Sequence, residues 1–247
     1  MRVTGKNQLQ TKSHTIWHAI LVCLAILTIP MQVRAIPDSP PWGVHNFRLG
    51  ESENAVMLAG QERFGSGNPI ESSMSLMDGR IANKVEAGSA TCFLGGSVAC
   101  EKFTFIFSQP EAGNGLMSIS LEESFGRDVV STNEITKNLR HVYGDEQRRS
   151  QLQLISPKGG RAVFPTTTKL VWSRRPIPEQ YDPSVFAGPA ELSGQIGGGE
   201  IVVVLLQHLP GDEDHVQGVQ LLAVELDLAR ITASALSGRK RPVDPTF

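Results

Sequence analysis

Apolar side chains recur with two different periods along the chain, and this contrast predicts which segments are strands and which are helices. Every second residue is apolar at 102–108, where three phenylalanines share one face, and at 115–123. A period of two is typical of a strand with one buried face. The unbroken apolar run within 200–209 predicts a strand that is covered on both faces or central in its sheet. Further strands are predicted at 73–81, 151–156, 166–173 and 216–228.

Two stretches with a helical period, 52–65 and 131–144, are similar to each other. Both begin Ser-x-Asn and end in an aromatic residue followed by glycine. Ser52 is the predicted N-cap of the first helix, and Ser131 with Glu134 predicts a capping box at the second. Two ordinary amphipathic helices that share these features by chance are the alternative interpretation. A third, shorter helix is predicted at 228–238.

One helix followed by three or four strands therefore occurs twice. We expect an α+β fold of two related halves, each a helix packed on a small antiparallel sheet. The halves are predicted at 36–126 and 127–238, and the second contains a long loop rich in proline and glycine at 174–200. The basic tail 239–247 is expected to be solvated.

The entry to the first helix, Gly50-Glu51-Ser52-Glu53-Asn54-Ala55-Val56 closed by Phe64-Gly65, resembles a pattern of small exported bacterial proteins. It looks like the unit of the β-lactamase-inhibitor-protein fold and of the small lipoprotein of the outer-membrane β-barrel assembly machine. The second copy departs from the pattern, since no glycine precedes Ser131. The resemblance implies a binding or scaffolding module without catalysis, and it does not imply β-lactamase binding.

The first 35 residues have the pattern of a signal peptide. Basic residues precede the apolar run 16–29, and Val33-Arg34-Ala35 places small residues at the positions that signal peptidase prefers. Cleavage is predicted between Ala35 and Ile36. The mature protein is therefore expected in the periplasm or outside the cell. A retained N-terminal membrane anchor is the alternative, although the run is shorter than the ~20 apolar residues of a typical span.

Removal of this segment makes the chain more acidic. It takes away four of the 23 basic residues and none of the 25 acidic ones, which changes the formal charge from −2 to −6. An acidic chain with few tryptophans lacks the basic surface that nucleic-acid binding requires. We therefore expect no nucleic-acid partner, and no stable membrane span after signal removal.

Cys92 and Cys100 are the two cysteines that remain after cleavage, and they are predicted to form a disulfide. A hairpin loop at 95–97 would place them opposite each other on two antiparallel strands, where Cβ atoms lie ~4.5–5.5 Å apart. A redox-active or metal-binding pair is the alternative, but the C-x-x-C spacing is missing.

The sequence predicts no catalytic residue, metal site or cofactor. It has no phosphate-binding loop, nucleophile elbow or histidine pair at ligand spacing. We expect a non-catalytic binding or scaffolding protein whose partner is an unknown protein or envelope component. Tyr181 and Phe186, in the long loop, are the candidate partner-binding residues; a flexible insertion without function is the alternative. The competing hypothesis is an envelope hydrolase, with His141 or His208 as its base.

Overall fold

The computed structural model describes residues 41–65, 71–77, 80–89, 91–92, 96–153 and 166–238. The predicted signal peptide with its cleavage site at Ala35 and Ile36, and the basic tail 239–247, lie outside these residues. No helix among the described residues is long and apolar enough to cross a membrane.

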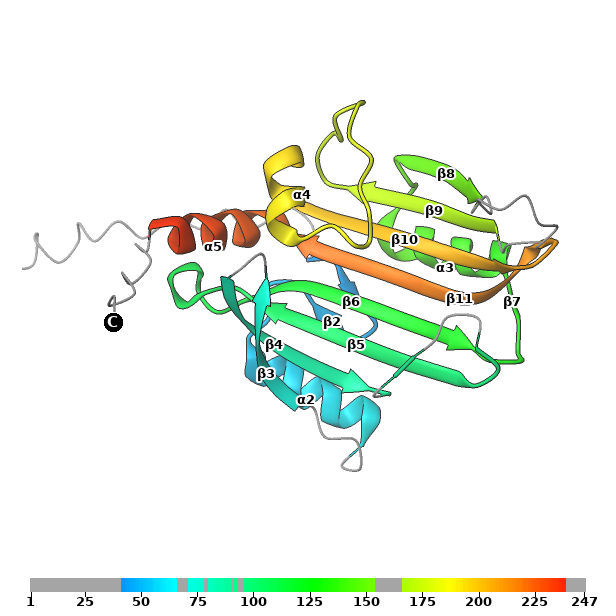
Figure 1. The fold of residues 1–247 in the computed structure, drawn as a ribbon, viewed down its shortest axis with the longest axis horizontal. Coiled ribbons are helices and arrows are strands. Elements are labelled where there is room, and N and C mark those ends of the chain that lie inside the picture. The colour runs from blue at the N-terminus through cyan, green and yellow to red at the C-terminus, as the bar shows by residue number, and fades with distance from the viewer. Residues whose placement is uncertain are drawn as a thin grey trace, which may run out of the picture. The chain divides into compact units, whose positions relative to one another are not determined.

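Antiparallel strands are the most abundant element of the described chain, with helices between them (Figure 1). The elements are, in chain order, β1 Gly43–Val44, β2 Phe47–Arg48, α2 Glu53–Phe64, β3 Glu71–Met77, β4 Arg80–Gly88, β5 Ala99–Phe107, the 3₁₀ turn η1 Pro110–Ala112, β6 Leu116–Phe125, β7 Val130–Ser131, α3 Thr132–Tyr143, β8 Arg148–Gln153, β9 Thr166–Ser173, α4 Pro189–Ile196, β10 Glu200–Leu209, β11 Asp212–Glu225 and α5 Leu226–Gly238.

A single large sheet replaces the two small sheets that the sequence predicted. Its strand order is β3-β4-β5-β6-β11-β10-β9-β8, and the short β7 also pairs with β11. Strand β6 belongs to the first predicted half and β11 to the second, on either side of the predicted boundary at 126/127. These two strands nevertheless pair, from Gly218↔Ser124 to Val224↔Ser118. The prediction of two helix-on-sheet halves is therefore wrong. The physical reason is that two separate sheets would each leave the last strand with unpaired backbone groups, whereas pairing β6 with β11 removes both edges.

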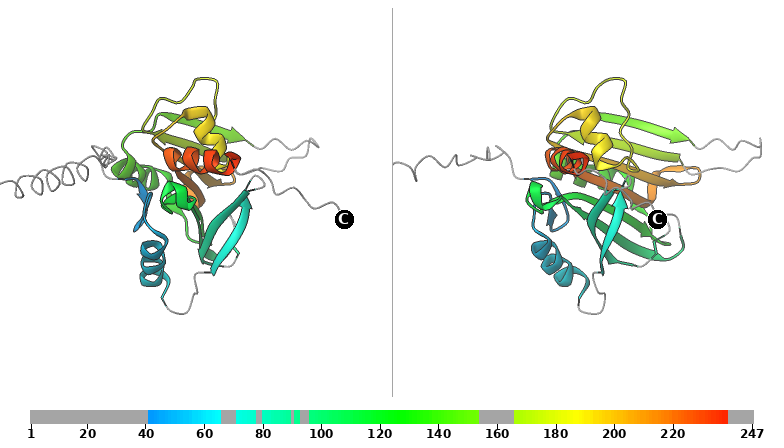
Figure 2. Two further views of the ribbon diagram at one scale, coloured as in Figure 1. Left: turned by 90° about the vertical axis from the view of Figure 1, so that its left-hand side faces the viewer. Right: turned by 60° about the vertical axis from the view of Figure 1, so that its left-hand side comes forward.

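The sheet carries helices α2 and α3 on one face, which we call the α2–α3 face (Figure 2). Alternation along β5 directs Phe103, Phe105 and Phe107 to this face, where all three are buried. Val56 of α2 and Tyr143 of α3 belong to the same buried cluster. The period-two pattern of the phenylalanines, predicted from the sequence, is thus the main apolar layer beneath these helices.

Helices α4 and α5 cover part of the opposite face. Leu192 of α4 and Leu226 of α5 pack with Ile201, Val203 and other side chains from the opposite face of the sheet. Strand β10 lies between β9 and β11 and is buried on both faces, as its unbroken apolar run predicted. Helix α4 was not predicted, because its sequence lies within the segment interpreted as a loop. Strand β11 begins earlier than expected, at Asp212, and the last helix begins at Leu226.

The helix-end predictions have different outcomes at the two helices. The Ser52 side chain accepts a hydrogen bond from the Ala55 backbone N–H at 3.3 Å, which confirms this N-cap. Ser131 makes no capping hydrogen bond through its side chain, so the predicted capping box with Glu134 is wrong. Instead Ser131 belongs to β7, where it pairs with His215 of β11. Both helices end at a glycine with positive φ, Gly65 and Gly144, as predicted.

The predicted disulfide between Cys92 and Cys100 is present, with Cα atoms 5.5 Å apart. Cys100 lies in β5, but Cys92 lies outside the strands, so the expected pairing of two strands at the cysteines is not what brings them together. Cys100 immediately precedes Glu101, and the bridge therefore fixes the chain beside the start of β5. Of the predicted hairpin loop 95–97, residue 95 lies outside the described residues, together with 93 and 94.

Candidate functional site

Four charged or titratable side chains meet on the α2–α3 face although they come from four different elements. His45 lies in the turn between β1 and β2, Arg63 in the last turn of α2, Glu101 in β5 and Glu123 in β6. His45, Glu101 and Glu123 each place one potential ligand atom within 4.8 Å of the others. We call these four residues the His45 cluster.

Strand register explains why the two glutamates lie together. Glu101 and Glu123 are directly paired residues of the antiparallel strands β5 and β6. Side chains two positions apart share a face, so Glu101 lies on the same face as Phe103, and Glu123 on the same face as Leu121. Phe103 and Leu121 are both buried on the α2–α3 face. The sheet therefore brings two acidic groups to the edge of an apolar layer.

His45 reaches the glutamates because the β1–β2 connection is very short. Val44 pairs with Phe47, which leaves only His45 and Asn46 in the turn. His45 has a φ of +55°, the left-handed conformation that such two-residue turns require. Its ring lies edge-on to Phe103, with 5.9 Å between ring centroids. Its Nε2 lies 3.6 Å from Oε1 of Glu101.

Arg63 neutralises one of the two glutamates. Its Nε donates to Oε2 of Glu101 at 3.1 Å, and its Nη2 donates to Oε1 at 2.5 Å. This two-point geometry is the strongest arrangement of an arginine and a carboxylate. Burial, and then the charge of Arg63, lower the pKa of His45, while Glu101 opposes the effect. His45 is therefore mostly neutral near pH 7.

Glu123 differs from Glu101 because it has no such partner. Among the described residues, no hydrogen bond or ion pair to the Glu123 carboxylate is present. Burial, and then the negative charge of Glu101, raise the pKa of Glu123, and Arg63 offsets this only in part. A half-buried carboxyl group with a raised pKa and no partner is a frequent feature of binding and catalytic sites.

Two hollows adjoin the cluster, and both are lined by Glu123 and Phe125. The first, which we call the α2 hollow, has a volume of about 500 Å³ and is also lined by Arg63 and Glu101. The second, the α3 hollow, has a volume of about 400 Å³ and is also lined by His45. Most side chains that line the α3 hollow are apolar, among them Leu121, Leu139, Val142, Val219 and Leu221. Small-molecule sites commonly have this size, an apolar lining and a few polar groups.

A metal ion is a poor fit to the His45 cluster despite its three potential ligands. Zinc accepts histidine nitrogen and carboxylate oxygen ligands, so the donor set alone is suitable. However, both oxygens of Glu101 already bind the Arg63 guanidinium. A divalent cation at the same carboxylate would lie close to this fixed positive charge and would be repelled by it.

The long loop is held in place by Arg148 of β8. Its guanidinium donates to the backbone carbonyls of Tyr181 at 2.6 Å, Pro178 at 2.8 Å and Ile177 at 3.1 Å. The Tyr181 ring packs against the apolar cluster beneath α4 and α5, whereas Phe186 is 78% exposed. Of the two candidate partner-binding residues, Tyr181 thus contributes to packing, and Phe186 is available at the surface. Neither lines the two hollows.

The two histidines of the hydrolase hypothesis lie in separate places. His208 is 1% exposed, and its ring nitrogens lie 2.8 Å from the Thr168 hydroxyl and 3.4 Å from the Thr132 hydroxyl. His141 is exposed on α3. In the described part of the chain, neither has a serine, aspartate or glutamate side chain within hydrogen-bond distance, so neither has the geometry that this hypothesis requires.

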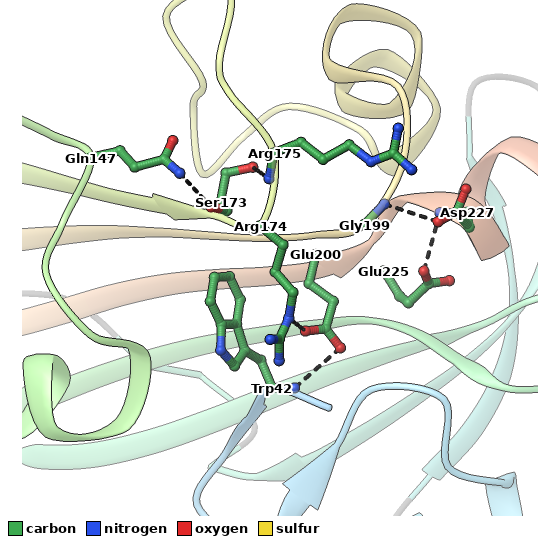
Figure 3. A network of polar contacts seen from close by, with 9 residues as sticks. All are labelled: Trp42, Gln147, Ser173, Arg174, Arg175, Gly199, Glu200, Glu225 and Asp227. Atoms are coloured by element: carbon green, nitrogen blue, oxygen red, sulfur yellow. Dashed lines mark hydrogen bonds and ion pairs between the residues drawn. The ribbon is translucent and has the colours of Figure 1, made fainter. Parts of the chain in front are cut away.

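A second polar cluster lies where β1 meets the end of β9 (Figure 3). Nε of Arg174 donates to Oε2 of Glu200 at 2.5 Å, and the Arg174 guanidinium lies 4.7 Å from the ring centre of Trp42. The Trp42 backbone N–H donates to the other oxygen of Glu200. Glu225 accepts backbone N–H groups at the start of α5, and Asp227 accepts that of Gly199. These contacts join β1, β10 and α5, and we call the residues involved the Glu200 cluster.

Little in the sequence indicated the His45 cluster. His45, Arg63, Glu101 and Glu123 are far apart in the chain and follow no motif with a fixed spacing. One signal was available in principle: the alternation of 102–108 and of 115–123 assigns Glu101 and Glu123 to the apolar face of their strands. An acidic residue on an apolar face is unusual, and it indicates either a pairing partner or a site.

Comparison of the chain with protein-family models, curated proteins and solved structures finds no match. The function is therefore argued from the residues and geometry of this chain.

Proposed function

We propose that this is an exported, non-catalytic binding protein of the periplasm or the cell exterior, and that the α2–α3 face receives its partner. The observation that carries the proposal is the α3 hollow, an open apolar hollow of about 400 Å³ with the unpaired Glu123 carboxylate on its lining. Apolar side chains supply affinity when water is displaced, and the carboxylate orients whatever is bound.

The sequence supports export and binding independently of the hollow. The first 35 residues have the pattern of a signal peptide, and the Ser52 helix resembles binding and scaffolding modules of the bacterial envelope. The partner in this proposal is a protein or another envelope component. The exposed Phe186 is a further apolar contact point, on the loop that Arg148 holds in place.

Site-specific photo-crosslinking in the native cells tests this proposal. Val142 of α3 lines the α3 hollow and is 52% exposed, so p-benzoylphenylalanine in its place would face a bound partner. Leu58 of α2 is 63% exposed and does not line either hollow, which makes it the matched control position.

We expect irradiation to give one reproducible adduct from position 142 and none from position 58. The intact mass of the adduct tells whether the partner is a protein or a small envelope component. Equal adducts from both positions, or none from position 142, would contradict the assignment of the α2–α3 face.

A second candidate, an envelope hydrolase, is favoured by one observation in the His45 cluster. Glu101, which accepts two hydrogen bonds from the Arg63 guanidinium, lies beside Glu123, whose raised pKa favours the protonated form. A carboxylate and a carboxylic acid side by side can serve as base and acid in glycoside hydrolysis. Release of soluble sugar fragments from purified cell wall, abolished by Glu123→Gln and by Glu101→Gln, would establish this function instead.

A further inference from the structure

The charges around the α3 hollow leave one negative group without a partner. Glu101 is neutralised by Arg63, and His45, which also faces Glu101, is mostly neutral. Glu123 is the remaining acidic group on the lining of this hollow. A carboxylate at the edge of an apolar surface without a counter-ion is costly to desolvate, and a ligand that brings a positive charge would remove that cost.

We infer that the Glu123 carboxylate binds the ammonium group of an aliphatic primary amine whose alkyl chain lies in the α3 hollow. This inference rests on the proposed binding function and narrows its ligand to a small amphiphilic amine. The apolar side chains below Glu123 contact the alkyl chain, notably Leu121 and Phe125 of β6 and Leu139 of α3.

The positions of the two arginines favour this orientation of the ligand. Arg63 lines the α2 hollow and not the α3 hollow, so its charge is not on the lining that would hold the proposed amine. Arg48 does line the α3 hollow. Its charge acts at the Tyr143 end, where burial raises the pKa of the Tyr143 hydroxyl and Arg48 partly offsets this. The ammonium group is therefore placed near Glu123 and away from Arg48.

An organic ammonium group fits better than a metal ion for two reasons. It carries a single charge and needs only one carboxylate, so it does not compete with Arg63 for Glu101. It also brings an apolar chain, which a metal ion lacks, and burial of each CH₂ group strengthens binding. An alkyl chain makes use of the size and apolar lining of the α3 hollow, whereas a metal ion does not.

The binding should depend on pH in a defined direction. Around Glu123, the titratable and charged groups are Glu101 on β5, Arg63 on α2, His45 in the β1–β2 turn, and Arg48 and Asp128 on the linings of the two hollows. The ammonium group binds the ionised carboxylate, so a proton must leave Glu123 when it is protonated. Affinity therefore rises as the pH increases through the raised pKa of Glu123 and then becomes constant.

Isothermal titration of the purified protein with n-octylamine, n-octanol and n-octanoate tests this inference. At pH 7 the amine is a cation, the alcohol is neutral and the carboxylate is an anion, while the chain length is the same. A hydrogen bond to a charged group contributes ~1.5–3 kcal/mol, so we expect the amine to bind about tenfold or more tightly than the alcohol. Octanoate should bind most weakly.

Two variants separate the role of Glu123 from a general effect of charge. Glu123→Gln should reduce the affinity for octylamine to that for octanol and leave octanol binding unchanged. Glu122→Gln is the matched control, because this neighbour on β6 lies on the opposite face of the sheet by strand alternation. It removes the same net charge and should leave the preference for the amine intact. Methyl NMR shifts on binding should be confined to residues such as Leu121, Leu139 and Val142.

Three results would overturn the inference. The first is equal binding of amine and alcohol, or binding that Glu123→Gln does not affect; the binding function of the face would then still be tested by the crosslinking at position 142. The second is tight binding of Zn²⁺ that requires both His45 and Glu123. The third is a protein adduct at position 142 that excess octylamine does not displace, since the occupant would then be a protein surface.

Discussion

The His45 cluster and the Glu200 cluster contain the same kinds of groups but differ in how completely these are paired. Each cluster has an arginine held by a glutamate and a further glutamate whose pKa is raised first by burial. In the Glu200 cluster the second glutamate, Glu225, accepts backbone N–H groups of Leu228 and Asp227. In the His45 cluster the second glutamate, Glu123, lacks any such donor among the described residues.

This difference separates a structural cluster from a candidate site. The Glu200 cluster fastens β1 and α5 to the sheet, and all its carboxylates have partners within the protein. The His45 cluster lies beside two hollows and retains one unsatisfied acid. A half-buried carboxyl group with a raised pKa and no partner, next to two hollows, is the kind of group that binding sites frequently contain. Changes in the first cluster should therefore affect stability, and changes in the second should affect binding.

The largest expected effect comes from removing Arg174 from the Glu200 cluster. Its partner Glu200 is 8% exposed, and Arg174→Met would leave this carboxylate buried with one fewer donor. Removing one member of a buried ion pair costs ~3 kcal/mol, so we expect the free energy of unfolding, measured by urea denaturation, to fall by about that amount. Arg230→Met is the control: its pair with Asp227 is exposed and contributes at most ~1 kcal/mol. Equal losses in the two variants would contradict the structural role of the Glu200 cluster.

The next largest effect concerns the disulfide beside the His45 cluster. Replacement of both Cys92 and Cys100 by serine should lower the free energy of unfolding by ~2–3 kcal/mol, because a short loop is no longer closed in the unfolded chain. Cys100 and Glu101 both line the α2 hollow, so hydrogen exchange should increase at the start of β5 and remain unchanged in β10. An increase of the same size in both strands would show that the bridge acts on the whole sheet.

The parts of the fold that follow from local pattern were predictable, and the parts that depend on pairing between distant strands were not. The phenylalanine alternation placed β5, and the unbroken apolar run placed β10 at an interior position of the sheet. Cys92 and Cys100 were correctly paired from their spacing. By contrast, the pairing of β6 with β11 joins residues about 100 positions apart, and no local signal specifies it. This is why the sequence led to two separate halves where one continuous sheet exists.

The candidate site was missed for a related reason. It is assembled from a turn, a helix end and two strands, and only strand register brings Glu101 opposite Glu123. The long loop illustrates the opposite error: its proline and glycine content predicted an irregular segment, but Pro189–Ile196 forms α4 and Arg148 binds three carbonyl groups of the loop. Proline at the first helical position is favourable, and this signal was available within the segment.

Removal of Arg63 is expected to have a smaller effect on stability than the two changes above. The pair of Arg63 and Glu101 is partly exposed, so Arg63→Met should cost only ~0.2–1 kcal/mol. The clearer consequence of the substitution is electrostatic. Burial and the charge of Glu101 raise the pKa of Glu123, and the charge of Arg63 lowers it. We expect a carboxyl ¹³C NMR titration to show a still higher pKa of Glu123 in this variant. Arg127→Met, an exposed arginine in the turn after β6, is the control and should leave that titration unchanged.

The smallest expected effect is the change in stability on Glu123→Gln, and it distinguishes the two clusters most directly. Between the ordinary pKa of a glutamate and the raised pKa of Glu123, the folded protein binds more protons than the unfolded chain, so the free energy of unfolding falls as the pH rises through this window. Glu123→Gln stays neutral and avoids this loss.

The Glu123→Gln variant should therefore be slightly more stable than the original protein at pH 7, and equally stable below the ordinary pKa of glutamate, where both side chains are neutral. Thermal unfolding at a series of pH values measures this difference. The matched change in the Glu200 cluster, Glu200→Gln, should lower stability at pH 7, because it weakens the bond to Arg174. If Glu123→Gln also lowered stability at pH 7, the Glu123 carboxylate would have a stabilising partner in the folded protein, and the contrast between the two clusters would be lost.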